Sequence, residues 1–130
     1  MPELRVLVVE DDFVTRKLLM EMLQGQFLCD GASDGQEALE AYNFSVKNGT
    51  PYAAIILDIS MPRVSGPQAL RLIREAERKE GLETGHGVPV MVLTAHKSAV
   101  VESFKSGCDG YMVKPVSAAE LSAKIMGLIK

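Results

Sequence analysis

The most informative stretch of this sequence is Ile55-Ile56-Leu57-Asp58-Ile59-Ser60-Met61-Pro62. Its apolar run is typical of a buried strand in a parallel sheet, and the run ends in a single carboxylate. Asp58 therefore lies at the carboxyl end of the predicted strand, where open α/β sheets bind their ligands. A lone aspartate at a strand end is more often a turn residue or a helix cap, so its role depends on the rest of the chain.

Length and composition indicate one soluble globular domain. The 130 residues are 47% hydrophobic and 24% charged, and the formal net charge of -3 argues against a nucleic-acid surface. No apolar run reaches membrane-spanning length and the amino terminus lacks a signal-peptide layout, so we expect a cytoplasmic protein without membrane contacts. Cys29 and Cys108 have no metal-site spacing and are expected to be free thiols.

The hydrophobic pattern predicts strands that alternate with helices. Strands are expected over residues 4–9, 27–32, 53–58, 88–93 and 109–113. Helices are expected over residues 13–25, from Asp34 to about Asn48, from Ser65 to about residue 79, over 98–106, and from Ser117 onward. The result is an α/β fold of the (βα)₅ type, with a parallel sheet covered on both faces.

Two helices carry specific expectations about which residues face the core. In the helix over 13–25, one apolar face is predicted from Val14, Leu18, Met22, Leu19 and Leu23. In the helix that begins at Ser65, the residues expected to face inward are Leu70, Ile73 and Ala76. Its charged residues are predicted to form a solvated face made of Arg71, Arg74, Glu75, Arg78 and Lys79.

Four predicted strands end in polar residues. These are Glu10-Asp11, Asp58, Thr94 and Lys114. Because the carboxyl ends of parallel strands lie on one edge of the sheet, we expect these side chains to converge. Clustered carboxylates raise one another's pKa, so the cluster needs cations, which Lys114 and a hard divalent ion such as Mg²⁺ would supply.

Such an assembly is suited to phosphoryl transfer. Asp58 would be the nucleophile that forms an aspartyl phosphate. The metal and Lys114 would stabilise negative charge on the phosphoryl oxygens, and the Thr94 hydroxyl would donate a further hydrogen bond. Taken singly, each residue has a structural alternative as a cap, a turn residue or a surface cation, but coincidence of all of them is improbable.

Over its whole length the chain resembles a bacterial response-regulator receiver domain. The matching motifs are Val8-Val9-Glu10-Asp11-Asp12, Leu57-Asp58-Ile59-Ser60-Met61-Pro62 with Gly66, Leu93-Thr94-Ala95, and Gly110-Tyr111-Met112-Val113-Lys114-Pro115. The resemblance implies a flavodoxin-like fold with sheet order 2-1-3-4-5, an order that the hydrophobic pattern alone does not provide. It also implies a single receiver domain over residues 1–130 without an output domain.

The resemblance assigns roles to the converging residues. Asp58 would accept a phosphoryl group from a phosphohistidine on a sensor histidine kinase or a histidine phosphotransfer domain. Asp11, Asp58 and the main-chain carbonyl of Ser60 would bind Mg²⁺, for which Mn²⁺ can substitute, and Glu10 would act through a metal-bound water. Asp12 falls one position past the acidic pair and is expected to be exposed or a helix cap. The Lys114-Pro115 peptide bond is expected to be cis.

The resemblance also implies a switch. Thr94 would move toward the phosphoryl group and Tyr111 would swing inward, which would change the face formed by the fourth helix, fifth strand and fifth helix. That face would contact a downstream protein that the sequence does not identify. Ser60 and His96 occupy positions that influence the phosphoryl lifetime in this family, although an exposed loop histidine is an equal alternative for His96.

Two other functions fit the sequence less well. An aspartyl-nucleophile phosphatase would need an acid two residues after the nucleophile, where this chain has Ser60. A flavodoxin-like flavin protein would need a Ser/Thr-rich phosphate loop after the first strand, where Glu10-Asp11-Asp12 would repel a phosphate in the absence of a metal. A signalling module that catalyses only its own phosphorylation and dephosphorylation is therefore the leading prediction.

Overall fold

The structure is a computed structural model that describes residues 4–59, 65–81, 87–95 and 107–129. Its strands are β1 (Arg5–Val9), β2 (Leu28–Ala32), β3 (Ala54–Ile59), β4 (Val90–Thr94) and β5 (Gly110–Val113). Its helices are α1 (Phe13–Leu23), α2 (Gly35–Lys47), α3 (Ser65–Lys79) and α5 (Ala118–Leu128). The helix predicted over 98–106 lies outside the described residues.

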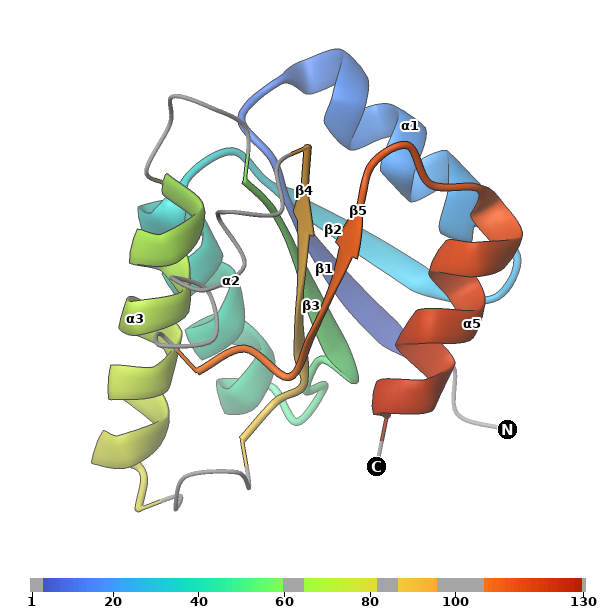
Figure 1. Cartoon of the computed structure of the whole chain (residues 1–130). Coiled ribbons are helices and arrows are strands. Elements are labelled where there is room, and N and C mark those ends of the chain that lie inside the picture. The colour runs from blue at the N-terminus through green and yellow to red at the C-terminus, as the bar shows by residue number, and fades with distance from the viewer. Residues whose placement is uncertain (1–3, 60–64, 82–86, 96–106, 130) are drawn as a thin grey trace.

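All five strands are parallel and form one sheet in the order β2-β1-β3-β4-β5, which confirms the predicted flavodoxin-like topology. Figure 1 shows α2 and α3 on one face of the sheet and α1 and α5 on the other. Alternate side chains of β1 point to opposite faces of the sheet. Leu7 and Val9 belong to one core cluster, and Val6 and Val8 belong to the other. The less apolar strand β2 lies at an edge, as its composition predicted.

Side-chain caps explain where three helices begin. The Asp34 carboxylate accepts a hydrogen bond from the Glu37 amide at 2.8 Å, and the Ser117 hydroxyl accepts one from the Glu120 amide at 3.1 Å. The Asp12 carboxylate accepts hydrogen bonds from both the amide and the hydroxyl of Thr15, at 2.9 and 2.7 Å. Asp12 is thus the exposed helix cap that was predicted, and it anchors the start of α1.

The predicted apolar face of α1 is partly wrong. Leu19 and Leu23 are buried, but Val14 and Leu18 are 62% and 51% exposed. Successive helical residues differ in direction by about 100°, so the stripe through Val14 and Leu18 points away from the stripe through Leu19 and Leu23. Leu19 and Leu23 pack against the sheet, and Met22 is partly buried against the same core cluster.

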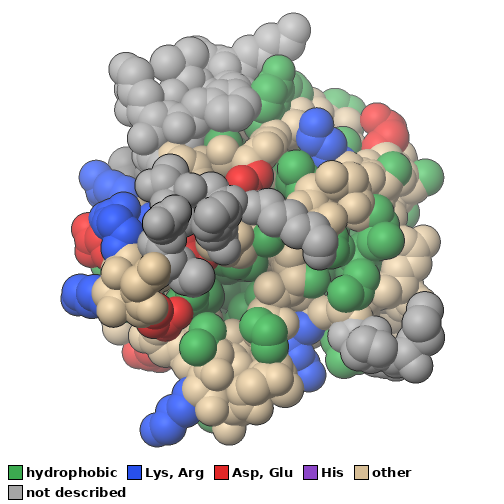
Figure 2. All heavy atoms as spheres, turned by 90° about the horizontal axis from the view of Figure 1, so that it is seen from below, with side chains coloured by type: hydrophobic (Ala, Val, Ile, Leu, Met, Phe, Trp, Pro, Cys, Tyr) green, Lys and Arg blue, Asp and Glu red, His purple; other side chains and the backbone are tan. Residues whose placement is uncertain are grey.

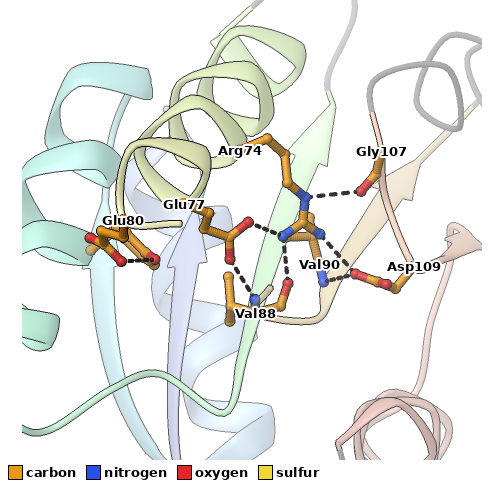
Figure 3. Close-up of polar contacts among 8 residues, drawn as sticks. Arg74, Glu77, Glu80, Val88, Val90, Gly107 and Asp109 are labelled. Atoms are coloured by element: carbon orange, nitrogen blue, oxygen red, sulfur yellow. Dashed lines mark hydrogen bonds and ion pairs between the residues drawn. The ribbon is translucent and has the colours of Figure 1, made fainter. Parts of the chain in front are cut away.

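The predicted solvated face of α3 is wrong at one residue. Leu70 and Ile73 are buried as expected, whereas Arg74 folds back against the protein and is largely covered. All three of its guanidinium nitrogens donate hydrogen bonds (Figure 3). The acceptors are the Gly107 carbonyl at 3.1 Å, the Glu77 carboxylate at 2.7 Å, the Val88 carbonyl at 2.9 Å and the Asp109 carboxylate at 2.9 Å.

The Glu77 and Asp109 carboxylates also accept hydrogen bonds from backbone amides just before β4 and at its first residue. Glu77 accepts from the Val88 amide at 2.6 Å, and Asp109 accepts from the Val90 amide at 2.8 Å. A Cβ at Gly87 would overlap the Glu77 carboxylate, so a larger residue there would displace Glu77 from its contacts with Arg74 and Val88. We call Arg74, Glu77 and Asp109 the Arg74 cluster.

The remaining charges of α3 lie at the surface. Figure 2 views the end of the molecule where the strands begin, and Lys and Arg side chains gather along the margin formed by α3, with Asp and Glu side chains among them. The mixed signs favour a solvated surface rather than an anion-binding patch. No helix in the described part of the chain is long and apolar enough to cross a membrane.

Candidate functional site

The strand register brings the predicted site residues to one edge of the sheet. Asp58 is paired with Leu93, one residue before Thr94, and Thr94 is paired with Val113, one residue before Lys114. Glu10 follows directly after β1, and its amide donates to the Ala32 carbonyl at 2.9 Å. The predicted convergence at the carboxyl ends of β1, β3, β4 and β5 is therefore present, at the upper end of the sheet in Figure 1.

Asp58 and Lys114 form an ion pair across the site. The Lys114 Nζ atom lies 2.5 Å from Asp58 Oδ2, and Asp58 is only 4% exposed. The peptide bond from Lys114 to Pro115 is cis, as the family resemblance implied. The Lys114 amide donates to the Thr94 carbonyl at 2.8 Å, so β4 and β5 together fix the base of the lysine side chain.

Glu10 is the most perturbed acid of the site. It is 2% exposed, and its Oε2 atom has no hydrogen-bond partner among the described residues. The pKa of Glu10 is raised from 4.5 to about 7, mainly by burial and then by the Asp58 and Asp11 carboxylates, while Lys114 acts in the opposite direction. A buried carboxylate oxygen without a partner is rare in native structures, and it fits a site that binds a cation.

The donor set fits a hard divalent cation. The Glu10, Asp11 and Asp58 carboxylates are oxygen donors of the kind that such a cation prefers, and their mutual repulsion favours binding of positive charge. In the described ranges, no three His, Cys, Asp or Glu side chains are grouped closely enough to hold a metal ion by themselves. Mg²⁺ does not need such a group, because it binds through one or two carboxylates and retains several waters.

The two residues predicted to switch lie in different environments. Thr94 is buried at the end of β4, one strand away from Asp58. Tyr111 is 40% exposed on β5. Their proposed movements remain predictions, and Ser60 and His96 lie outside the described residues.

The sequence analysis did not identify Arg16. This residue lies in the first turns of α1, and its Nη1 atom donates to the main-chain carbonyl of Glu10 at 2.7 Å. A cation near a helix amino terminus opposes the helix dipole. That unfavourable placement is the signal in the sequence that could have drawn attention to it.

Comparisons with known proteins agree with this geometry. The model of the response regulator receiver domain family matches residues 6–126. Hybrid signal transduction histidine kinase I of Dictyostelium discoideum is 38% identical over 116 residues, which cover 87% of this chain and 6% of that protein. The chain spans about half the length or less of the first curated relatives that it matches.

Two solved structures are similar over almost the whole chain. One is the receiver domain of Saccharomyces cerevisiae Ssk1, crystallised with the histidine phosphotransfer protein Ypd1, with a TM-score of 0.77, 29% identity, and coverage of 98% of this chain and 89% of that one. The other is the receiver domain of the sensor histidine kinase PA1611 from Pseudomonas aeruginosa, with magnesium coordinated in its active-site cleft. Its TM-score is 0.77, with 26% identity and coverage of 98% of both chains.

Proposed function

This chain belongs to the response regulator receiver family, and we propose that its Asp58 is the residue that accepts the phosphoryl group. The observation that carries this proposal is the ion pair between buried Asp58 and Lys114, beside the Glu10 carboxylate oxygen that has no hydrogen-bond partner among the described residues. We propose a phosphohistidine on a sensor histidine kinase or a histidine phosphotransfer protein as the donor. The yeast neighbour, crystallised with the phosphotransfer protein Ypd1, supports this class of partner.

In the proposed reaction, an Asp58 carboxylate oxygen attacks phosphorus while the bond from phosphorus to the donor imidazole nitrogen breaks. The electron pair stays on the imidazole, and the product is an acyl phosphate on Asp58. The Lys114 ammonium is already paired with Asp58, so it is placed to stabilise the negative charge that the phosphoryl group brings. The buried Thr94 would donate a hydrogen bond to a phosphoryl oxygen.

The cation site would be formed by Asp11, Asp58 and the Ser60 carbonyl, with Glu10 bound through a water. When bound, Mg²⁺ or Mn²⁺ would neutralise charge on the transferring phosphoryl oxygens. Deprotonated Glu10 is needed for this site, and the positive charge of the cation would favour that form. The magnesium in the Pseudomonas receiver domain supports the choice of Mg²⁺.

The output we propose is a change in a protein-binding surface. Thr94 and Tyr111 would move after phosphorylation and alter the face formed by β5, α5 and the chain between β4 and β5, which would then bind a downstream protein. We propose that this cytoplasmic domain turns over no external metabolite. The phosphatase alternative is not favoured, because the matches to the chain are receiver domains.

The test is to incubate the protein with Mg²⁺ and acetyl phosphate and to measure its intact mass. We expect one added phosphoryl group in the wild type, and none in Asp58→Asn or when EDTA replaces Mg²⁺. The Asp12→Asn variant is a matched control, because it changes an acid outside the proposed site, and it should be phosphorylated like the wild type. Equal labelling of wild type and Asp58→Asn would refute the assignment of Asp58.

A further inference from the structure

We propose that Arg16 is a positioning residue for the cation site, acting through the main-chain carbonyl of Glu10. This inference rests on the proposed function, because it concerns the turn that carries the acidic pair Glu10-Asp11. Arg16 belongs to α1 and its side chain extends back toward the end of β1, where the Nη1 atom donates to the Glu10 carbonyl at 2.7 Å. The turn is thus tied to the helix that follows it.

The amide and the carbonyl of Glu10 each form a hydrogen bond with another part of the protein. Its amide donates to the Ala32 carbonyl of β2 at 2.9 Å, and its carbonyl accepts from Arg16. On the other side of the turn, Asp12 caps α1 through Thr15. Glu10 and Asp11 therefore lie between fixed points, and the contact with Arg16 uses a main-chain oxygen, so it occupies neither carboxylate.

The path of the Arg16 side chain is also constrained. Its guanidinium carbon lies 5.5 Å from the centre of the Phe13 ring, within the range of a cation–π contact. A Cβ at Gly31 of β2 would lie 3.1 Å from Arg16 Cδ and 3.3 Å from Arg16 Nε. The glycine leaves room for the arginine to reach Glu10, so the position of Arg16 depends on β2 as well as on α1.

Such a restraint is needed because the acids of the site repel one another. The Glu10, Asp11 and Asp58 carboxylates converge at one edge of the sheet, and without a cation the repulsion between them would push the turn away from Asp58. A tether on the Glu10 carbonyl opposes that movement and keeps the acidic pair in place for the cation. Removing an outer partner of this kind typically weakens metal affinity about 10- to 100-fold.

The experiment is a calorimetric titration of the unphosphorylated full chain with Mg²⁺. The main variant is Arg16→Met, which keeps an apolar stem over Gly31 but has no donor, and we expect about tenfold weaker Mg²⁺ binding. Arg16→Lys, which retains a charged donor, should recover most of the affinity. Lys17→Ala is the matched control, because it removes the same charge from an exposed neighbour on α1 and should bind like the wild type.

A second variant tests the same tether without altering the arginine. Gly31→Val places a branched side chain against Arg16 Cδ, and we expect weaker Mg²⁺ binding with the helix content of the wild type by circular dichroism. The inference is overturned if Arg16→Met and Gly31→Val both bind Mg²⁺ like Lys17→Ala. It is also overturned if Arg16→Lys is as weak as Arg16→Met. A wild-type protein that neither binds Mg²⁺ nor accepts phosphate would instead refute the proposed function.

Discussion

The two ends of the sheet each hold a cluster of charges, and the clusters differ in how well those charges are satisfied. At the carboxyl end, Glu10, Asp11 and Asp58 face one amine, and a Glu10 oxygen has no partner among the described residues. At the amino end, the Arg74 guanidinium donates four hydrogen bonds, and its two carboxylate partners also accept backbone amides. Burial of charge is common to both, so burial alone does not identify a functional site.

The two clusters differ in whether their charges are balanced and hydrogen-bonded within the protein. The planar guanidinium of Arg74 matches several acceptors at once, so that cluster is complete within the protein. At the other end of the sheet, burial and then the neighbouring carboxylates raise the pKa of Glu10 to about 7, so that cluster favours the binding of positive charge. An incomplete cluster is ready to bind a ligand, whereas a complete one contributes to stability.

The largest effect is expected from breaking the complete cluster. Arg74→Met leaves Glu77 and Asp109 buried or partly buried without their cation, and we expect a loss of about 3 kcal/mol in the free energy of unfolding. Arg71→Met is the matched control, because it removes an exposed arginine from the same helix, and its effect should stay within about 0.5 kcal/mol. Urea denaturation would measure both, and equal stability of the two variants would show that the Arg74 contacts contribute nothing.

A smaller effect on stability, which depends on pH, is expected from Glu10. Its pKa is higher in the folded protein than the ordinary value of 4.5, so the folded state holds a proton that the unfolded state has released. Without metal, stability should therefore fall as the pH rises from 4.5 to about 7, by about 2 kcal/mol from this group. The difference between wild type and Glu10→Gln in urea denaturation at several pH values isolates the contribution of Glu10.

Saturating Mg²⁺ sharpens this test. Because the cation binds the deprotonated carboxylates, it should remove the loss of stability near pH 7 in the wild type. Arg74→Met should keep the wild-type difference between pH 5 and pH 7.5, since its cluster is at the other end of the sheet. A wild type and Glu10→Gln with parallel pH profiles would show that Glu10 is ionised normally.

The smallest effect distinguishes two neighbouring acids. Asp12 caps α1 through two hydrogen bonds from Thr15, so Asp12→Ala should lower stability by about 1 kcal/mol and leave Mg²⁺ affinity unchanged. Asp11→Ala should reduce repulsion with Glu10, keep or raise stability, and abolish Mg²⁺ binding. Thermal unfolding and calorimetry on both variants would test this, and the reverse pattern would exchange the two roles.

The sequence predicted the site better than it predicted the Arg74 cluster, for a physical reason. Parallel strands deliver their carboxyl ends to one edge, so the placement of Asp58, Thr94 and Lys114 follows from topology alone. Arg74 and Asp109 are 35 residues apart and meet only after α3 packs beside the loop that precedes β5. Helical periodicity treats a charge on the outer side of a helix as solvated and contains no information about such a partner.

A similar limit applies to α1. The sequence offers two apolar stripes of equal quality, and only the position of the helix over the sheet selects Leu19 and Leu23 rather than Val14 and Leu18. The Arg16 contact was missed because its acceptor is a main-chain carbonyl, which no residue type reveals. Contacts between helices and strands can therefore be predicted from the sequence more easily than contacts between a side chain and the backbone.

The contacts of β4 have a mechanical consequence. This strand is five residues long, which is about 16 Å. Its first amide, on Val90, is held by Asp109, and Asp109 is held in turn by Arg74. The amino end of β4 is therefore held by the Arg74 cluster. If phosphorylation displaces Thr94 as proposed, we expect the displacement to be largest next to Asp58 and to diminish toward Val90.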